Sequence, residues 1–192
     1  MSAPESAPQA EGRPGFHLDA QATIEVRDAL HSDIPELLRL MRSLATFEGY
    51  AADFAVTARD LAMRGFGPRP QFFAKLAVDT ARDIAAGMAV FYLVPFTYDL
   101  RPTLMLKELY VDERYRNRRV GERLMIALAR QARRIGCGRM RWDVLHGNHQ
   151  AERFYGRLGG QREDRWIAWR MDRSGIDALD RDTDQSVDAR MC

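Results

Sequence analysis

The sequence is poor in cysteine, in long apolar runs and in net charge. Its 192 residues include two cysteines, Cys137 and Cys192, and neither lies among other thiols or histidines at a metal-ligand spacing. A disulfide framework is therefore excluded, and we expect a reducing, cytoplasmic environment. No apolar run is long enough to cross a bilayer, and Met1 to Gly12 lack the apolar core of a signal peptide, so we expect neither export nor a membrane partner.

The formal net charge of +2 gives no global reason to expect a nucleic-acid partner. The positive charge is nevertheless uneven, because Glu122 is the only acid between Arg114 and Arg141. A basic helix face of this kind is usually solvated, and no aromatic pattern or motif of a nucleic-acid module accompanies it. We therefore expect no nucleic-acid binding.

A hydrophobic content of 46% is enough to bury one core of ordinary size. Residues 1–22 are rich in Pro, Ala, Glu and Gly without periodicity, which predicts a disordered N-terminal segment. Residues 173–192 are polar, Asp-rich and aperiodic, which predicts a polar C-terminal tail. The folded domain is expected over residues 23–172.

Apolar periodicity divides this domain into strands and helices. Strands are predicted at residues 24–26, 72–78, 84–94, 103–111, 140–145 and 166–171. Helices are predicted at residues 34–47, from Thr57 to Gly65, at 120–135 and at 150–158, with Gly136 and Gly159-Gly160 as stop signals. The order β-α-α-β-β-β-α-β-α-β contains no internal repeat and predicts an α/β fold with a mixed sheet.

One segment joins a buried strand, a basic loop and a helix start in close succession. It reads Leu109-Tyr110-Val111-Asp112-Glu113-Arg114-Tyr115-Arg116-Asn117-Arg118-Arg119-Val120-Gly121-Glu122. Free backbone N–H groups at a helix N-terminus, flanked by guanidinium groups, form a site for a polyphosphate. A pyrophosphate group would suit this segment.

At these residues the chain resembles the GNAT acetyltransferases, whose motif is Gln or Arg, two free positions, Gly, one free position, then Gly or Ala. Here the motif falls on residues 116–121, with Arg119 at the middle Gly position. Asn148, Phe154-Tyr155 and Leu158-Gly159 match the family's later Asn, Phe-Tyr and Leu-Gly positions. Residues 44–50, 65–70 and 96–99 are similar to the spermidine/spermine acetyltransferases in particular.

The resemblance implies the GNAT fold, in which a mixed, mostly antiparallel central sheet is flanked by helices on both faces, and acetyl-CoA as cosubstrate, with no metal. It implies an N-acetyltransferase that moves the acetyl group to a primary amine of a small cationic acceptor, such as a polyamine, a diamine or a lysine-like molecule. Tyr155 is expected to be the catalytic general acid that returns a proton to the coenzyme thiolate. The residues expected to bind the coenzyme are Leu109, Tyr110, Val111, Arg116, Asn117, Arg118, Arg119, Val120, Gly121, Glu122 and Asn148.

The acceptor is expected to meet acidic and aromatic side chains. The candidates are Phe47, Glu48, Glu108, Asp143 and Asp164. Glu48 beside aromatic residues suits an ammonium group, because a carboxylate and aromatic faces both attract cations. Glu108 lies in a strand that should be buried, where an unpaired carboxylate is costly, so it needs a partner or a function.

Two departures from the family pattern leave alternatives open. Lys107 stands where the resemblance implies an acid, and it would repel a polyamine or pair with Glu108. Arg119 is expected to be tolerated only with a negative φ and with its side chain reaching toward Arg123. Transfer to a protein amine and a non-catalytic acyl-CoA-binding module are the alternative functions.

Two further expectations concern assembly and metals. Relatives of this type commonly pair, so a homodimer is expected. His146 and His149 lie three residues apart without a further ligand nearby in sequence, so no metal site is expected there.

Overall fold

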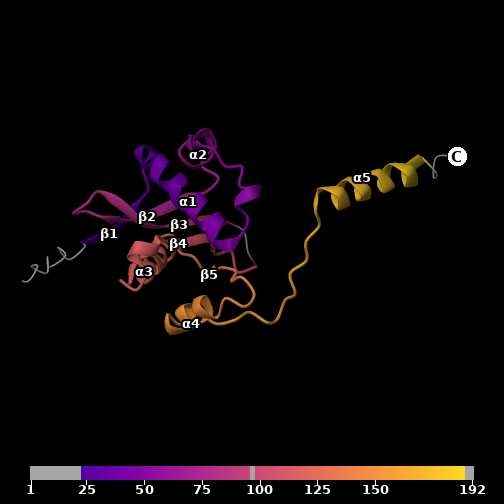
Figure 1. Cartoon of the computed structure of the whole chain (residues 1–192). Coiled ribbons are helices and arrows are strands. Elements are labelled where there is room, and N and C mark those ends of the chain that lie inside the picture. Colours follow the sequence, from indigo (N-terminus) through magenta and orange to yellow (C-terminus); the bar gives the residue numbers. More distant parts are fainter. Residues whose placement is uncertain (1–22, 96–97, 189–192) are drawn as a thin grey trace, which may run out of the picture. The chain divides into compact units, whose positions relative to one another are not determined.

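The computed structural model describes residues 23–95 and 98–188, and the predicted N-terminal segment 1–22 lies outside this range (Figure 1). The chain forms two compact units, Met1–Leu145 and His146–Cys192. The first unit contains the sheet and the second contains two helices. The predicted domain boundaries at 23 and 172 stay a prediction.

The first unit is built on a five-stranded sheet. Its strands are β1 (Ile24–Asp28), β2 (Phe73–Asp79), β3 (Ile84–Val94), β4 (Thr103–Val111) and β5 (Arg139–Arg141). They lie side by side in chain order; β1 to β4 pair antiparallel, and β4 pairs parallel with β5. The prediction of a mixed, mostly antiparallel sheet is therefore confirmed.

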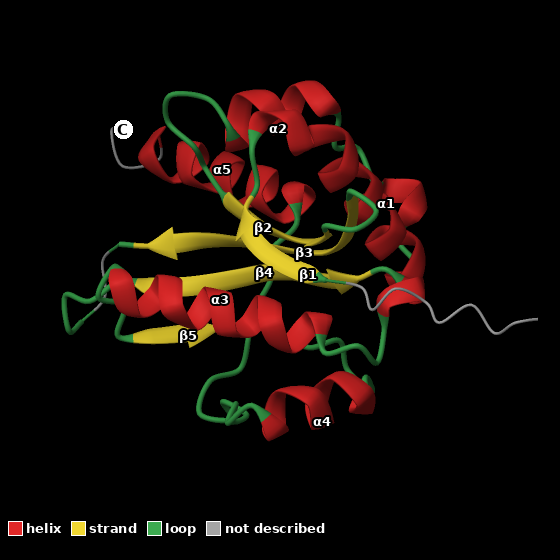
Figure 2. Cartoon of the chain, turned by 90° about the vertical axis from the view of Figure 1, so that its left-hand side faces the viewer, coloured by secondary structure: helices red, strands yellow, loops and turns green. Residues whose placement is uncertain are grey.

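Helices cover both faces of this sheet, as predicted. The helices α1 (Ile34–Glu48) and α2 (Ala58–Gly65) lie on one face, and α3 (Val120–Arg134) lies on the other (Figure 2). Short 3-10 turns precede or connect them at His31–Asp33, Ala51–Asp53 and Glu113–Tyr115. The apolar stripe of α1 packs on alternate residues of the central strands, which forms the main core: Leu37, Leu40, Met41, Leu44, Leu61, Leu76, Met88, Val90 and Tyr110.

Local signals fix where the first two helices begin and end. Pro35 lies in the first turn of α1, and Gly49 ends the helix in the left-handed conformation at φ 83°. Thr57 caps α2 by accepting a hydrogen bond from the backbone N–H of Asp60, whose side chain accepts one from Thr57 in return. Glu48 consequently lies at the C-terminal end of α1, where the helix dipole favours a cation.

Strand β4 has a bulge and then an open edge. Val90 of β3 pairs with Glu108 whereas Phe91 pairs with Leu106, so Lys107 is the extra residue of a β-bulge. On its other side β4 pairs with β5 only over Thr103 to Met105. Among the described residues, the remainder of β4 has no strand on that side, so its backbone there is available to a ligand.

Two predicted strands differ from the structure. Residues 140–145 were expected to form one strand, but β5 is Arg139–Arg141 and the chain leaves the sheet after it. Residues 166–171 form no strand; Trp166 is 67% exposed and Trp169 is 93% exposed. The segment is rich in apolar and aromatic residues, but a strand also requires a neighbouring strand to pair with, which the sequence pattern does not supply.

The second unit contains α4 (His149–Arg157) and α5 (Arg173–Asp188). Helix α4 agrees with the predicted helix at 150–158. Helix α5 replaces the predicted aperiodic tail. Asp172 accepts hydrogen bonds from Ser174 Oγ at 2.7 Å and from the Gly175 N–H at 3.0 Å, which caps the helix, and Arg173 pairs with Asp177 one turn later.

Candidate active site

The loop from β4 to α3 presents backbone groups that suit a phosphate. Arg119 precedes α3, and its side chain makes no capping hydrogen bond to the first turn of the helix. A helix N-terminus attracts an anion through its N–H groups and its dipole. The predicted strand end, basic loop and helix start are therefore present, and the binding of a pyrophosphate there stays a prediction.

The conformation of this loop corrects the expectation for Arg119. Asn117 and Arg119 both adopt the left-handed conformation, at φ 60° and φ 59°. Arg119 was expected to need a negative φ, but an isolated left-handed residue costs only about 1 kcal/mol. Its side chain also differs from the expectation, because it forms two hydrogen bonds with Glu122, at 2.7 and 2.8 Å, rather than reaching toward Arg123.

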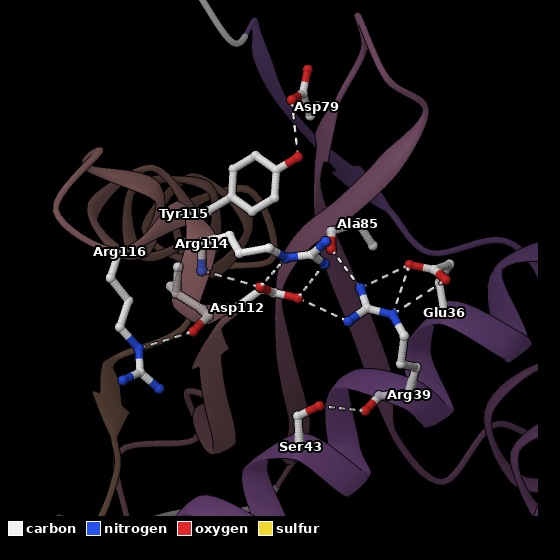
Figure 3. Close-up of polar contacts among 10 residues, drawn as sticks. Glu36, Arg39, Ser43, Asp79, Ala85, Asp112, Arg114, Tyr115 and Arg116 are labelled. Carbon is white, nitrogen blue, oxygen red and sulfur yellow. Dashed lines mark hydrogen bonds and ion pairs between the residues drawn. The ribbon is translucent and has the colours of Figure 1, made fainter.

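A buried carboxylate network anchors the same loop to the sheet and to α1 (Figure 3). Asp112 accepts hydrogen bonds from Arg39 Nη1 at 2.9 Å and from Arg114 Nε and Nη2, both at 3.0 Å. Arg39 also donates to the Ala85 carbonyl at 2.8 Å, so the network joins α1, β3 and the end of β4. The Arg114 and Arg39 hydrogen bonds lower the pKa of Asp112 from 3.8 to about 2.

A second buried carboxylate holds the turn beyond Asp112. Tyr115 donates its hydroxyl to the fully buried Asp79 at 3.0 Å (Figure 3). Arg82 donates to the same carboxylate at 2.9 Å. The pKa of Tyr115 is raised by burial and by this hydrogen bond. The sequence analysis missed both carboxylate networks. Asp112, the acid that follows the end of β4 directly before an arginine-rich turn, is a local signal that could have indicated the first of them.

Glu108 is the half-buried carboxylate that the structure leaves unsatisfied. Its Oε2 atom is buried and has no hydrogen-bond partner among the described residues. Burial raises the pKa of Glu108, Lys107 lowers it, and Glu48 raises it again. Burial also raises the pKa of Tyr50, with Glu108 and Glu48 adding to the effect. The predicted acceptor residues Glu48 and Glu108 therefore share one electrostatic environment.

Arg116 was predicted to bind the coenzyme, but its side chain lies against a predicted acceptor residue. Its guanidinium group stacks 4.8 Å from the ring centroid of Phe47 and 5.9 Å from that of Tyr110. Its Nε donates to the Val111 carbonyl at 3.4 Å (Figure 3). Arg116 and Phe47 thus meet on the face of β4 that carries Tyr110, next to the end of α1. The neighbouring Arg118 stacks instead on Tyr115, at 5.8 Å.

The remaining predicted residues are Asp143 in the first unit and Asn148, Tyr155 and Asp164 in the second. Asp143 is exposed beyond β5. In the second unit, Asn148 caps α4 by accepting from the Ala151 N–H at 3.0 Å, and Tyr155 is half-buried with its ring 5.0 Å from Phe154. Asp164 is exposed, 3.6 Å from Arg162. The roles of these four residues stay predictions.

Metal-ligand groups and membrane-spanning helices are both absent from the described residues. These residues contain no group of three or more His, Cys, Asp or Glu side chains that could hold a metal ion. His149 lies 2.9 Å from Glu152. None of the helices in the described ranges has the length and apolarity that a membrane crossing requires.

The mixed sheet with a bulged β4, followed by a basic loop and the start of α3, is the architecture of an acyl-CoA transferase. The chain belongs to the acetyltransferase (GNAT) family, whose model matches residues 36–160, and it is thus an acetyl-CoA-dependent acyltransferase. The family match confirms the resemblance described above.

Individual relatives agree with this family. The chain is 27% identical over 160 residues to thialysine N-epsilon-acetyltransferase of Mus musculus, covering 79% of this chain and 94% of the relative. It is 28% identical over 172 residues to spermidine/spermine N(1)-acetyltransferase-like protein 1 of Homo sapiens, covering 84% of this chain and 24% of that protein. An integron cassette protein from the V. cholerae mobile metagenome shares the fold, with a TM-score of 0.69, 22% identity, and coverage of 81% of this chain and 96% of that one.

Proposed function

We propose that this protein transfers the acetyl group of acetyl-CoA to a primary amine of a small cationic acceptor, in the class of polyamines, diamines and lysine-like molecules. The observation that carries the proposal is the buried Oε2 of Glu108, which has no hydrogen-bond partner within residues 23–95 and 98–188 and belongs to the part of β4 that does not pair with β5. An unpaired carboxylate oxygen in this position is costly unless a ligand supplies a donor. The relatives named for thialysine and for spermidine and spermine support the same acceptor class.

The coenzyme would lie along the open edge of β4. Backbone groups of Leu109 to Val111 would hold the pantetheine arm, and the N–H groups at the start of α3 would hold the pyrophosphate. Arg118 and Arg119 would add positive charge nearby, and Asn148 is proposed to contribute from α4. The Asp112 network supports this role because it fixes the strand end from which the loop departs.

The acceptor amine would be held by Glu108 and Glu48. The C-terminal end of α1 adds negative potential at Glu48, and Phe47 and Tyr50 provide aromatic surface. Asp143 and Asp164 are further candidates for contacting a longer acceptor.

The reaction requires three proton transfers: the ammonium loses one proton before it attacks, the nitrogen loses a second as the amide forms, and the departing thiolate gains one. The second proton from the nitrogen restores the one that the general acid gives to the thiolate. Acetyl-CoA supplies a thioester, whose carbonyl carbon the amine attacks and whose sulfur leaves. The amine must be neutral to attack, so its proton passes to Glu108 or to water. A carboxylate with a raised pKa is a better base near neutral pH than an ordinary one. Tyr155 is proposed to give its proton to the departing thiolate.

A panel assay of thiol release with polyamines, diamines and lysine analogues tests the acceptor class. Replacing Tyr155 with Phe keeps the ring and should lower turnover by about a hundredfold without weakening acetyl-CoA binding. Tyr98→Phe is the matched control, because Tyr98 is 86% exposed and stacks on Arg139 away from the site. Unchanged turnover in Tyr155→Phe would remove Tyr155 from the mechanism.

Two rival functions are outcomes of the same assay. Acetyl-CoA binding without turnover on any amine would favour a non-catalytic acyl-CoA-binding module. Turnover on lysine within peptides but not on free amines would favour a protein-amine acetyltransferase.

The assembly and the location of the protein also belong to this proposal. A homodimer in the cytoplasm is expected, and light scattering of the purified chain would test the dimer directly.

A further inference from the structure

The arginines of the loop between β4 and α3 lie in different surroundings. Arg114 pairs with Asp112 at 3.0 Å, and Arg119 pairs with Glu122 at 2.7 Å. Arg118 is exposed, and its guanidinium group has no ion-pair partner in the part of the chain that the structure describes. The N–H donors of Arg118 can therefore bind an anion without breaking an ion pair.

Arg118 contacts the aromatic ring of Tyr115. The centre of its guanidinium group lies 5.8 Å from the ring centroid, a distance at which the negative face of the ring attracts a cation. A guanidinium group that stacks on a ring keeps its N–H donors in its own plane, so the donors stay available to a ligand. The position of the Tyr115 ring therefore limits where the donors of Arg118 can lie.

The Tyr115 ring is itself fixed from the β2–β3 hairpin. Tyr115 is 5% exposed, and its hydroxyl donates to Asp79, the last residue of β2, at 3.0 Å (Figure 3). The fully buried Asp79 also accepts from Arg82 at 2.9 Å and from the Ala81 N–H at 3.1 Å. Because three donors hold this carboxylate, a continuous chain of contacts leads from the hairpin turn through Tyr115 to Arg118.

We propose that Tyr115 is a positioning residue for coenzyme binding: anchored by Asp79, it holds Arg118 so that this guanidinium group binds a phosphate of acetyl-CoA. The inference rests on the proposed coenzyme site and gives Tyr115 and Asp79 a role that they exert through Arg118. A guanidinium group forms strong, charge-assisted hydrogen bonds with phosphate oxygens. Holding a long side chain in place before the ligand arrives reduces the conformational entropy that binding would otherwise cost.

Calorimetry of acetyl-CoA binding tests two single variants. Arg118→Gln removes the charge and should weaken binding about tenfold, the effect of one hydrogen bond to a charged group. Tyr115→Phe keeps the ring but removes the hydrogen bond to Asp79, and should weaken binding about fivefold because Arg118 is held less firmly. Asp79 retains its two other donors in this variant, so the fold should be kept.

Tyr98→Phe is the matched control for the loss of a tyrosine hydroxyl. Tyr98 also lies against an arginine, Arg139, at 4.8 Å from the ring centroid. It precedes the start of β4, whereas the coenzyme loop follows the end of that strand. The affinity for acetyl-CoA should therefore stay unchanged in Tyr98→Phe.

The double variant separates positioning from a general loss of order in the loop. If Tyr115 acts through Arg118, adding Tyr115→Phe to Arg118→Gln should weaken binding by less than about a further twofold. A merely structural role would give the same fivefold loss in both backgrounds, and that result would overturn the proposal. In thiol release, Tyr115→Phe should raise the KM for acetyl-CoA and leave the acceptor KM and kcat within about twofold.

A second ligand identifies the phosphate that Arg118 binds. Acetyl-CoA has a pyrophosphate and a ribose phosphate, and dephospho-CoA lacks the ribose phosphate. If Arg118→Gln also weakens the binding of dephospho-CoA, Arg118 binds the pyrophosphate; if the loss occurs only with CoA, it binds the ribose phosphate, and either result supports the proposal. Unchanged acetyl-CoA affinity in Arg118→Gln would overturn the proposal and leave acetyl transfer intact. Failure of the wild type to bind acetyl-CoA would contradict the proposed function as well.

Discussion

Two carboxylates lie four positions apart at the end of β4, the half-buried Glu108 and the buried Asp112. They differ in whether cationic side chains bind them. Asp112 is bound by Arg39 and Arg114, and its pKa is lowered to about 2. Glu108 has a buried oxygen that has no hydrogen-bond partner in the described part of the chain, and burial raises the pKa of this carboxyl. A carboxylate that is already bound by cationic side chains stabilises the fold, whereas an unbound one is available to a cationic ligand. The contrast indicates a structural role for Asp112 and supports the substrate-binding role proposed for Glu108.

The largest expected effect is on activity at Glu108. Glu108→Gln keeps the shape but removes the charge and the base, so kcat/KM should fall by about a hundredfold or more. The free energy of unfolding should stay constant or rise, because the substitution removes the desolvated negative charge of the Glu108 carboxylate. Steady-state thiol release and thermal unfolding check the two parts, with the exposed Glu113→Gln as a control. A destabilised variant with normal kcat/KM would reverse the assignment.

Asp112 should show the opposite pattern. Asp112→Asn removes the charge that pairs with Arg39 and Arg114, and the free energy of unfolding should fall by about 2 kcal/mol. This is below the range for fully buried pairs because Arg39 is partly exposed and keeps its ion pair with Glu36 at 2.9 Å. Turnover per folded molecule should change little. Urea unfolding and active-site titration measure these quantities. A large loss of turnover at unchanged stability would place Asp112 in the chemistry.

The two acids should also differ in their dependence on pH. The folded-state pKa of Asp112 lies below its ordinary 3.8, so its contribution is present above that pH and is lost as the pH falls toward about 2. As the pH falls across this range, the free energy of unfolding of the wild type should thus decrease by about 2 kcal/mol relative to that of Asp112→Asn. Glu108 has a raised pKa, so its contribution to stability is greatest when it is protonated and declines as the pH rises above its ordinary 4.5. Unfolding curves of the two variants from pH 2 to 8 would test both signs.

Glu48 should have a smaller effect than Glu108 because it is exposed. Glu48→Gln should raise the acceptor KM by about threefold and lower turnover less, since a charge contact made in both ground and transition states acts as uniform binding. A loss confined to turnover would identify Glu48 as the base instead of Glu108.

The smallest expected effect is at Arg119, whose side chain is 78% exposed. Its left-handed backbone is one that glycine adopts freely, so Arg119→Gly should change acetyl-CoA affinity by less than about tenfold. The wild type should lose affinity more steeply with salt, because it has one more cation near the phosphates. Calorimetry at two ionic strengths measures this, and rescue of an inactive wild type by glycine would show that Arg119 disables the site.

Local sequence patterns were sufficient for much of the fold. The apolar strands at 72–78, 84–94 and 103–111 and the helices α1, α2 and α3 follow from periodicity and from caps within a few residues, such as Thr57 and Gly49. The last predicted strand at 166–171 was wrong, because pairing depends on residues far away in the chain. Helix α5 was missed although its cap at Asp172 is local.

The site was predictable where its residues share one segment. Residues 109–122 form the expected strand end, loop and helix start. The partners of Asp112 could not be found in this way, because Arg39 lies 73 residues away. The contact of Arg116 with Phe47 was also missed, since motif matching identified the position but not the direction of the side chain.

The most direct test is a measurement of the two carboxyl groups themselves. Carbon-13 NMR of labelled Glu and Asp side chains can follow the pKa of Glu108 and of Asp112 with and without a bound acceptor such as lysine. We expect the pKa of Glu108 to start above its ordinary value and to fall when the acceptor binds, because a cation then stabilises the carboxylate, while the pKa of Asp112 stays near 2. A Glu108 pKa that does not respond to an acceptor which the enzyme acetylates would contradict the account.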